Sequence, residues 1–194
     1  ALIYYSVVST AELKVDAEEI AKLKDDDLPV YSVLVPLYHE AESLPTLVAA
    51  LQSLDYPADK LDVQLLLEED DEETRTALAG VSLAPGFSVT LVPPSLPRTK
   101  PKACNIGLDR AKGEYLVIFD AEDQPEKDQL KKAVVAFRRV PAEVICLQCK
   151  LNFYNSRQNW LTRWFTAEYS AWFDLSLPGL AALCAAIPLG GTSN

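Results

Sequence analysis

Short apolar segments alternate along this chain with longer segments in which apolar residues recur every three or four positions. The short segments have the length and β-branched content of buried strands, and the longer ones have the periodicity of helices packed on one side. This alternation is typical of an α/β fold with a mostly parallel, doubly wound sheet and helices on both faces. Strands are predicted at 30–36, 61–67, 87–92, 115–119 and 144–153. Helices are predicted at 40–54, 72–78, 102–111 and 128–137, with Gly113 as the C-cap of the third.

The two ends of the chain depart from this central pattern. Ser9-Thr-Ala-Glu12 resembles a capping box and predicts a helix to about Lys24, followed by the acidic run 25–27. Few of these residues are apolar, so we expect a solvated lead-in over 1–27 and a core domain over 28–194. The apolar start is too short to span a bilayer and lacks a basic flank, which argues against a signal peptide.

Aromatic side chains are concentrated after the last predicted strand. On a helix from about Arg157 to Leu177, Trp160, Trp164 and Phe165 fall on one side. Core packing is one interpretation of this stretch. The other is an amphipathic helix at a membrane surface, or against transmembrane helices outside this sequence, because aromatic residues are enriched at such interfaces.

Charge and cysteine content narrow the classes of protein. The 194 residues carry a formal net charge of −10, which argues against nucleic acid as the main partner. No apolar run reaches the roughly 18–20 residues that a membrane-spanning helix needs. Cys146 and Cys149 have the spacing of a zinc knuckle, but residues three apart on a strand point to opposite faces, and His39 is the single histidine. We therefore expect reduced thiols and a cytosolic setting.

The strongest chemical signal lies at the end of the predicted strand 115–119. Asp120, Glu122 and Asp123 follow that strand directly, and Pro125 then breaks it. Carboxylates this close repel one another unless a cation lies between them, and hard oxygen ligands suit Mg²⁺ or Mn²⁺ better than zinc. We interpret the three residues as metal ligands. The alternative is that Glu122 or Asp123 caps the following helix.

Two other predicted strands also end in polar residues, and ligands of parallel sheets bind beyond the carboxyl ends of the strands. The first strand leads into Val35-Pro-Leu-Tyr-His-Glu40, and the second leads into Glu68 and Glu69. A carboxylate can accept hydrogen bonds from the ring N–H of uracil or guanine. Lys100 and Lys102 can add charge-assisted hydrogen bonds to a diphosphate beside the metal. Together these residues predict a nucleoside-diphosphate site.

In these motifs the chain resembles the family 2 glycosyltransferases of the GT-A fold. Within them it is similar to the processive, membrane-associated branch of cellulose and glucomannan synthase-like proteins. The resemblance covers about 28–194 and rests on four motifs in the family's order. The first is Val35-Pro-Leu-Tyr-His-Glu40, similar to V-P-x-Y-N-E with His39 in place of asparagine. The others are Glu68-Glu69 at an Asp-Asp pair, Lys102-Ala-Cys-Asn105 at a K-x-x-x-L-N-type helix start, and Asp120-Ala-Glu122 at the D-x-D position.

The resemblance implies transfer of a sugar, with inversion, from a UDP- or GDP-sugar to a growing glycan or a lipid-linked acceptor. It implies Mg²⁺ or Mn²⁺ as the cofactor, and a longer bacterial parent protein at the cytoplasmic face of the inner membrane. The implied metal ligands are Asp120, Glu122 and Asp123. The residues implied to bind the donor are Pro36, Tyr38, Glu40, Glu68, Glu69, Lys100, Lys102, Asn105 and Asp120.

The same resemblance puts the catalytic base outside these residues. The family's T/S-E-D-like and Q-x-x-R-W motifs follow the region that ends here at Asn194. Gln158 to Trp164 contains similar letters at a different spacing. Glu168 and Asp174 are carboxylates, but nothing in their spacing marks either as a base. We therefore expect this chain to bind the donor and to transfer sugar poorly.

Two features leave alternatives open. Glutamates at Glu69 and Glu122, where the family has aspartates, extend each carboxyl by one methylene, so the choice of donor stays open. A sugar nucleotidyltransferase is a second candidate class, although such enzymes carry a glycine-rich, basic loop where this chain has the acidic, glycine-free segment 36–42. A non-catalytic nucleotide-binding module is a third.

Overall fold

The computed structural model describes residues 12–190, 192 and 193, which form two compact units. One unit is Val15–Pro141, and the other consists of the described residues of Ala1–Lys14 and Ala142–Asn194. The first unit contains the sheet and all the residues expected to bind donor or metal. The lead-in predicted over 1–27 and the core domain predicted over 28–194 stay predictions.

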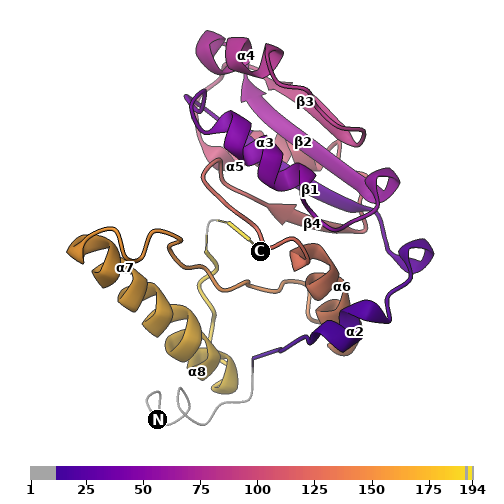
Figure 1. Cartoon of the computed structure of the whole chain (residues 1–194), viewed down its shortest axis with the longest axis vertical. Helices are drawn as coiled ribbons and strands as arrows, with labels where there is room; N and C mark the ends of the chain where they lie inside the picture. The colour runs from indigo at the N-terminus through magenta and orange to yellow at the C-terminus, as the bar shows by residue number, and fades with distance from the viewer. Residues whose placement is uncertain (1–11, 191, 194) are drawn as a thin grey trace. The chain divides into compact units, whose positions relative to one another are not determined.

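Four parallel strands form the sheet, in the order β3-β2-β1-β4 (Figure 1). In the register of β1, Tyr31 lies opposite Leu61 of β2 and Tyr115 of β4. Because the strands are parallel, their carboxyl ends lie along one side of the sheet, which we call the carboxyl edge. The parallel sheet predicted from the sequence is confirmed. The strands are β1 (Tyr31–Leu37), β2 (Leu61–Glu68), β3 (Phe87–Val92) and β4 (Tyr115–Ile118).

Helices cover both faces of the sheet, as predicted. Val33 and Val35 of β1 lie in the larger core, beneath α3, α4 and α6. Leu34 points to the opposite face, where it packs with Leu66 of β2 and Ala103 of α5. Alternate strand residues therefore build two apolar layers, as the pleat requires. The helices of this unit are α2 (Ala17–Ala21), α3 (Leu44–Gln52), α4 (Glu72–Ala79), α5 (Lys100–Leu108) and α6 (Gln129–Arg139), with 3₁₀ turns η1 (Asp25–Asp27) and η2 (Ala58–Lys60).

The lead-in helix is shorter than predicted. Its expected cap, Ser9, lies outside the described residues, and α2 begins only at Ala17. Asp16 is the N-cap: its carboxylate accepts a hydrogen bond from the Glu19 N–H at 2.9 Å, and Glu19 Oε2 accepts one from the Asp16 N–H at 3.1 Å. Because an N-cap residue has extended backbone angles, a continuous helix through position 16 is excluded.

Gly113 is not the C-cap of α5, contrary to the prediction. α5 ends at Leu108, and Asp109 is its C-cap. Gly113 instead lies against β1, where a Cβ would come within 2.4 Å of the Ser32 backbone nitrogen. Its N–H donates to the Ser32 hydroxyl at 2.8 Å, and that hydroxyl donates to the buried Asp62 carboxylate at 2.7 Å. This close approach is what requires glycine at the position.

The strand predicted at 144–153 is wrong: this segment, which lies within the described residues, is irregular. Isolated hydrogen bonds tie it to residues near the end of the chain. Cys149 N–H donates to the Ser193 carbonyl at 3.0 Å, and Gly190 N–H donates to Gln148 Oε1 at 2.6 Å. A strand needs a continuous ladder of hydrogen bonds with a neighbour, and isolated contacts of this kind do not provide one.

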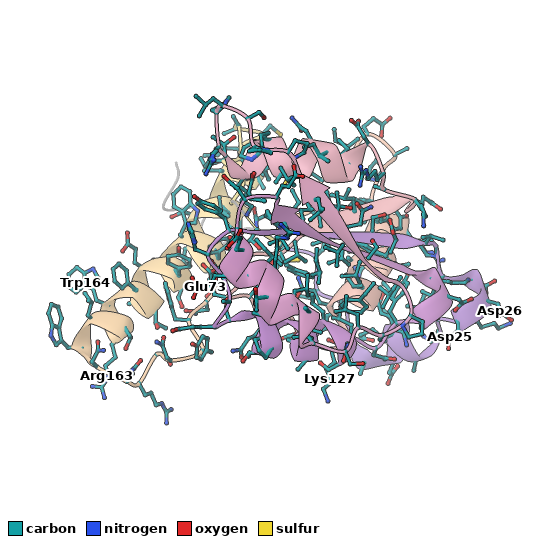
Figure 2. All side chains as sticks on the ribbon, turned by 90° about the horizontal axis from the view of Figure 1, so that it is seen from above. Asp25, Asp26, Glu73, Lys127, Arg163 and Trp164 are labelled. Atoms are coloured by element: carbon teal, nitrogen blue, oxygen red, sulfur yellow. The ribbon has the colours of Figure 1, made fainter. Side chains whose placement is uncertain are left out.

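The predicted aromatic helix forms, and its aromatic residues divide into a packed set and an exposed set. Phe153 packs against Phe165 and Tyr169, with ring centroids 5.8 and 4.7 Å apart. Trp160 and Trp164 are 76% and 69% exposed, and Figure 2 shows Trp164 projecting from the ribbon. No helix among the described residues is long and apolar enough to cross a bilayer. The helix consists of α7 (Trp160–Ser170), a π-helical turn η3 (Ala171–Ser176) and α8 (Leu177–Ala182).

Candidate functional site

Residues from three strand ends meet the start of α5 at the carboxyl edge. Tyr38 directly follows β1, Glu68 is the last residue of β2, and Asp120 lies two residues beyond β4. Lys100 and Lys102 occupy the first turn of α5 and form ion pairs with Asp120 and Glu68, respectively. The structure therefore brings together residues from all four motifs that the sequence predicted to bind the donor.

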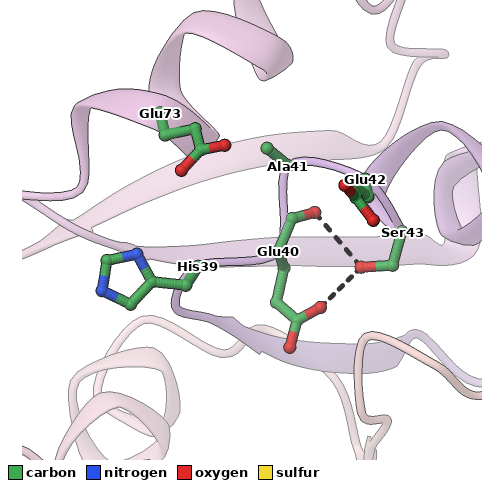
Figure 3. Close-up of a pocket in the computed structure, with 6 residues that line it drawn as sticks. All are labelled: His39, Glu40, Ala41, Glu42, Ser43 and Glu73. Carbon is green, nitrogen blue, oxygen red and sulfur yellow. Dashed lines mark hydrogen bonds between the residues drawn. The ribbon is translucent and has the colours of Figure 1, made fainter.

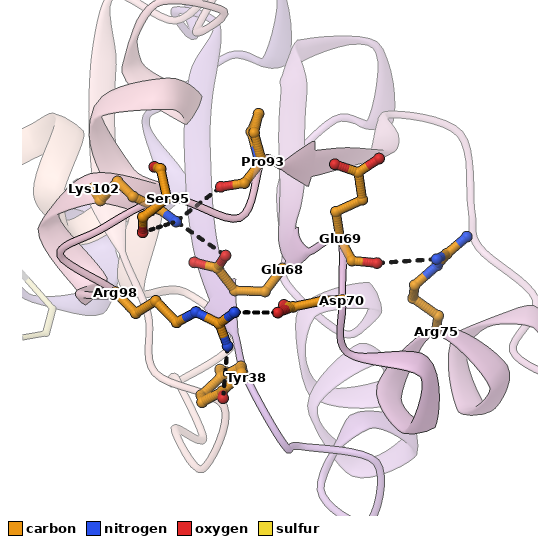
Figure 4. Close-up of polar contacts among 9 residues, drawn as sticks. All are labelled: Tyr38, Glu68, Glu69, Asp70, Arg75, Pro93, Ser95, Arg98 and Lys102. Carbon is orange, nitrogen blue, oxygen red and sulfur yellow. Dashed lines mark hydrogen bonds and ion pairs between the residues drawn. The ribbon is translucent and has the colours of Figure 1, made fainter.

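Lys102 and Glu68 form the more buried of the two pairs (Figure 4). Their charged atoms are 3.1 Å apart, and the side chains are 15% and 8% exposed. Lys102 Nζ also donates to the carbonyls of Pro93 and Ser95, at 3.0 and 3.4 Å. Lys102 thus holds the loop 93–99 beside the end of β2 and neutralises the Glu68 carboxylate.

Glu69 is arranged differently from its neighbour. Its side chain is exposed, while its backbone N–H donates to the Val92 carbonyl at 3.0 Å and its carbonyl accepts from Arg75 Nη1 at 3.0 Å. Successive strand residues point to opposite faces, and Glu68 has the same direction as Leu66, which packs beneath α5. Glu68 therefore faces α5, and Glu69 offers its carboxylate to solvent.

Arg98 is a functional candidate that the sequence analysis missed. Its guanidinium donates to the Tyr38 hydroxyl at 3.4 Å and forms an ion pair with Asp70 (Figure 4). It therefore links the loops that follow β1 and β2. Its position two residues before Lys100 could have marked Arg98 as a candidate. The spacing of residues along the sequence does not, however, predict its ion pair with Asp70 in the loop after β2.

The acidic cluster after β4 is a hydrogen-bonded turn. The Asp120 N–H donates to Asp123 Oδ2 at 2.7 Å, and the Asp123 N–H donates back to the Asp120 carbonyl at 3.1 Å. Asp123 thus stabilises the turn that leaves the strand and does not cap α6, whose N-cap is Asp128. Glu122 is exposed, and Asp120 accepts from Lys100 Nζ.

No group of three or more histidine, cysteine or acidic side chains within the described residues is gathered as a metal site. The assignment of Asp120, Glu122 and Asp123 as ligands stays a prediction. Their donor chemistry fits a divalent cation, since carboxylate oxygens are the preferred ligands of Mg²⁺. The ammonium of Lys100 against Asp120 shows in addition that this carboxylate accepts a cation.

The loop after β1 is fixed by residues at the start of α4. The His39 N–H donates to Asp71 Oδ2 at 2.7 Å, and the Glu40 N–H donates to Thr74 Oγ1 at 3.0 Å. Burial alone would raise the pKa of Asp71, but hydrogen bonds from His39 and Thr74 outweigh it and hold that pKa below its usual value. Asp71 is therefore a buried, ionised anchor for this loop.

A pocket of about 300 Å³ is lined by residues of the same loop together with Glu73 of α4 (Figure 3). The Glu40 carboxylate accepts a hydrogen bond from the Ser43 hydroxyl at 2.6 Å, which holds it within the loop. The pocket is strongly acidic, so it is poorly suited to an anionic ligand, which the lysines of α5 match better. The lining residues are His39, Glu40, Ala41, Glu42, Ser43 and Glu73.

The remaining predicted donor residues lie on the same elements. Pro36 is half-buried within β1, opposite Leu66 of β2. Asn105 is exposed on the second turn of α5, beyond Lys100 and Lys102.

A parallel sheet with helices on both faces defines an α/β domain, and ligands of such domains bind at the carboxyl edge. The comparison with known families makes the class more specific. The chain belongs to glycosyltransferase family 2, whose sequence model matches residues 32–187. The relationship inferred from the four motifs is thereby confirmed.

Its relatives include enzymes that build polysaccharides. Over 158 residues the chain is 28% identical to glucomannan 4-beta-mannosyltransferase 2 of Arabidopsis thaliana, covering 73% of the chain and 28% of the plant protein. Over 131 residues it is 32% identical to cellulose synthase 2 of Novacetimonas hansenii, covering 66% of the chain and 8% of the synthase. The chain therefore matches well under half the length of these relatives.

A solved structure supports the GT-A fold. The mannosyltransferase of Pyrobaculum calidifontis, solved in complex with GDP-Man and Mn²⁺, is 30% identical with a TM-score of 0.52. The match covers 72% of this chain and 43% of that one.

Proposed function

We propose that this domain binds a nucleotide-diphosphate sugar and a divalent cation at the carboxyl edge, and transfers the sugar with inversion to a glycan or a lipid-linked acceptor. The observation that carries the proposal is the pairing of Lys100 with Asp120 and of Lys102 with Glu68 on one turn of α5. These pairs place two cations for a diphosphate beside Asp120, a carboxylate for a metal, and next to Glu69, a carboxylate for the nucleobase. The complex of the Pyrobaculum enzyme with GDP-Man and Mn²⁺ supports this assignment.

The lysines bind the diphosphate in this proposal. Both lie in the first turn of α5, where the helix dipole also favours an anion. Charge-assisted hydrogen bonds from Lys100 hold the departing diphosphate, and the positive charge of Lys102 beside it helps to stabilise the charge that develops there.

The residues after β1 and β2 bind the nucleoside. The exposed carboxylate of Glu69 accepts from the base N–H groups, while Glu68 is engaged by Lys102. The half-exposed ring of Tyr38, linked to Arg98, offers an aromatic face to the base. Pro36, Glu40 and Asn105 are assigned to the donor from the sequence motifs, and they lie on β1, in the loop after it and on α5, respectively.

Asp120, with Glu122 and Asp123, would hold Mg²⁺ or Mn²⁺. A cation bound there supplies charge neutralisation to the leaving diphosphate. The acceptor hydroxyl must be deprotonated by a separate carboxylate, which we place in the part of the family's sequence that follows the matched region. Transfer by these 194 residues alone is therefore expected to be slow.

We further propose that the parent protein acts at the cytoplasmic face of a bacterial inner membrane. The exposed side chains of Trp160 and Trp164 are suited to a membrane interface or to neighbouring transmembrane helices. The relationship to a cellulose synthase supports a role in polysaccharide synthesis.

Titration calorimetry with GDP-Man, UDP-glucose and dTDP-glucose, each with Mn²⁺ and with EDTA, tests the proposal. We expect a GDP- or UDP-sugar to bind with Mn²⁺ and to bind more weakly in EDTA, because the diphosphate would then face Asp120 without a divalent counter-charge. Binding of none of the three would refute the function. Equal affinity with and without Mn²⁺ would refute the metal assignment alone.

A further inference from the structure

We propose that Lys100 occupies the place of a cation at Asp120 in the ligand-free chain, and that Lys100 and the divalent cation exchange at this carboxylate when the donor binds. The inference rests on the proposed function and deepens it. In this account Lys100 competes with the metal for Asp120 and also binds the donor diphosphate. Because one side chain has both roles, metal binding and donor binding are coupled.

The geometry of the turn after β4 permits such an exchange. The backbone of Asp120 is fixed, because its N–H donates to Asp123 Oδ2 at 2.7 Å and its carbonyl accepts from the Asp123 N–H at 3.1 Å. The Asp120 carboxylate can therefore change its partner while the strand end stays in place. The side chains of Lys100 and Asp120 are each 31% exposed, so ions in solution can reach the pair.

Electrostatic repulsion disfavours simultaneous binding of the Lys100 ammonium and a divalent cation at the Asp120 carboxylate. An ammonium and a divalent cation repel each other strongly when both lie against one carboxylate. A partly exposed ion pair is weak, so a divalent cation that gains more than one carboxylate can replace the ammonium. Displaced from Asp120, Lys100 stays at the first turn of α5 and can donate to the donor diphosphate. Metal and donor then strengthen each other's binding to the same extent.

Lys102 provides a matched comparison on the same helix. Its ammonium is held by three acceptors, Glu68 at 3.1 Å and the carbonyls of Pro93 and Ser95 at 3.0 and 3.4 Å. Lys100→Gln and Lys102→Gln remove the same charge from the first turn of α5, but only the former removes a cation from Asp120.

The test is a titration of the ligand-free chain with Mn²⁺, in which electron paramagnetic resonance measures the free ion. Lys100→Gln is expected to bind Mn²⁺ about three- to fivefold more tightly than the wild type, toward the upper end of the roughly 1.4- to 5-fold range of an exposed ion pair. Its affinity for GDP or UDP in the presence of Mn²⁺ is expected to fall. Lys102→Gln should show less than about a twofold gain in Mn²⁺ affinity, since only screened, longer-range repulsion is removed. Asp120→Asn should leave the signal of free Mn²⁺ undiminished, because it no longer binds the ion, and circular dichroism checks that each variant is folded.

Three outcomes would overturn the exchange. One is an equal gain in Mn²⁺ affinity in both lysine variants, which would indicate a general effect of charge. Another is unchanged or weaker Mn²⁺ binding by Lys100→Gln. The third is nucleotide binding by the wild type that does not depend on Mn²⁺, in which case Lys100 replaces the metal permanently. Failure of the wild type to bind nucleotide at all would instead refute the proposed function.

Discussion

The backbone N–H of His39 donates a 2.7 Å hydrogen bond to Oδ2 of Asp71, which joins the loop after β1 to the loop after β2. Oδ1 of the same carboxylate accepts from the Thr74 N–H at 3.1 Å and caps α4. His39 has a φ of 59°, a conformation that residues other than glycine rarely adopt. One buried carboxylate therefore starts a helix and also holds the loop beside Tyr38 in an uncommon conformation.

Asp71→Ser separates these two roles. A serine can still cap α4, but its shorter side chain cannot reach both N–H groups. We expect the free energy of unfolding to fall by about 1–3 kcal/mol, because the His39 N–H loses its partner. Donor affinity should fall as well, since Tyr38 and Glu40 flank His39. Urea unfolding and nucleotide titration measure the two effects, with the exposed Asp59→Ser as the control. A variant with wild-type donor affinity would show that this link between the loops is not needed for binding.

The same carboxylate predicts how stability depends on pH. The pKa of Asp71 is lower in the folded chain than in the unfolded chain, because hydrogen bonds from His39 and Thr74 outweigh the effect of burial. Its contribution is therefore complete above the unfolded value of about 4, and it is lost as the pH falls through the folded value. Asp71→Asn should flatten the loss of unfolding free energy below about pH 4. Chemical denaturation of both proteins at several pH values around and below 4 measures this free energy. The same steep loss in variant and wild type would assign the dependence to other groups.

Gly113→Ala should be strongly destabilising. A Cβ at this position would lie 2.4 Å from the Ser32 nitrogen and 2.5 Å from the Tyr115 carbonyl oxygen, and both are backbone atoms of the sheet. We expect a loss of about 2 kcal/mol or more in the free energy of unfolding. Gly80→Ala is the control, because its nearest neighbour would be the Ala77 carbonyl oxygen at 3.5 Å. Thermal melting of the two variants makes the comparison, and equal melting temperatures would contradict this account of Gly113.

The four strands of the sheet could be predicted because apolar runs, and the alternation of side chains between the two faces of a strand, depend on local sequence. The alternation of Val33 and Leu34 between two cores follows directly from the pleat. The segment 144–153 has the same composition as a strand, but a strand also requires a neighbour, and that depends on the fold. The local pattern of a strand therefore does not establish its pairing.

For the candidate site, the sequence predicts which residues lie at the carboxyl edge but not the contacts among them. The lysines and carboxylates of the carboxyl edge follow from motifs, whereas their pairing does not. The opposite directions of Glu68 and Glu69 could have been inferred, since Glu68 shares the parity of Leu66. The contact of Arg98 with Tyr38 depends on the path of the loop 93–99, which tertiary contacts such as those of Lys102 determine.

Replacement of the exposed tryptophans tests the proposed membrane contact. Trp160→Ser and Trp164→Ser should leave stability within about 0.5 kcal/mol, because these side chains are largely exposed. Association with vesicles of phosphatidylethanolamine and phosphatidylglycerol should decrease, because indole rings favour the lipid headgroup region. Leu96→Ser, which alters another exposed apolar residue, is the control. Sedimentation with vesicles measures the effect, and equal association of all variants with the wild type would exclude a membrane role for these tryptophans.

The neighbouring glutamates at the end of β2 should respond differently to the same change. Glu69→Gln places an amide where the proposed base N–H groups need an acceptor, so nucleotide affinity should fall by about 1–3 kcal/mol while stability is unchanged. Glu68→Gln removes the charge that pairs with Lys102 at 3.1 Å, so it should lower stability and donor affinity together. Glu73→Gln, on the exposed side of α4, is the matched control. Calorimetry with GDP and UDP, together with urea unfolding, distinguishes these effects. A loss of affinity in Glu68→Gln alone would move base recognition to Glu68, and unchanged affinity in both variants would show that the nucleoside does not bind at the end of β2.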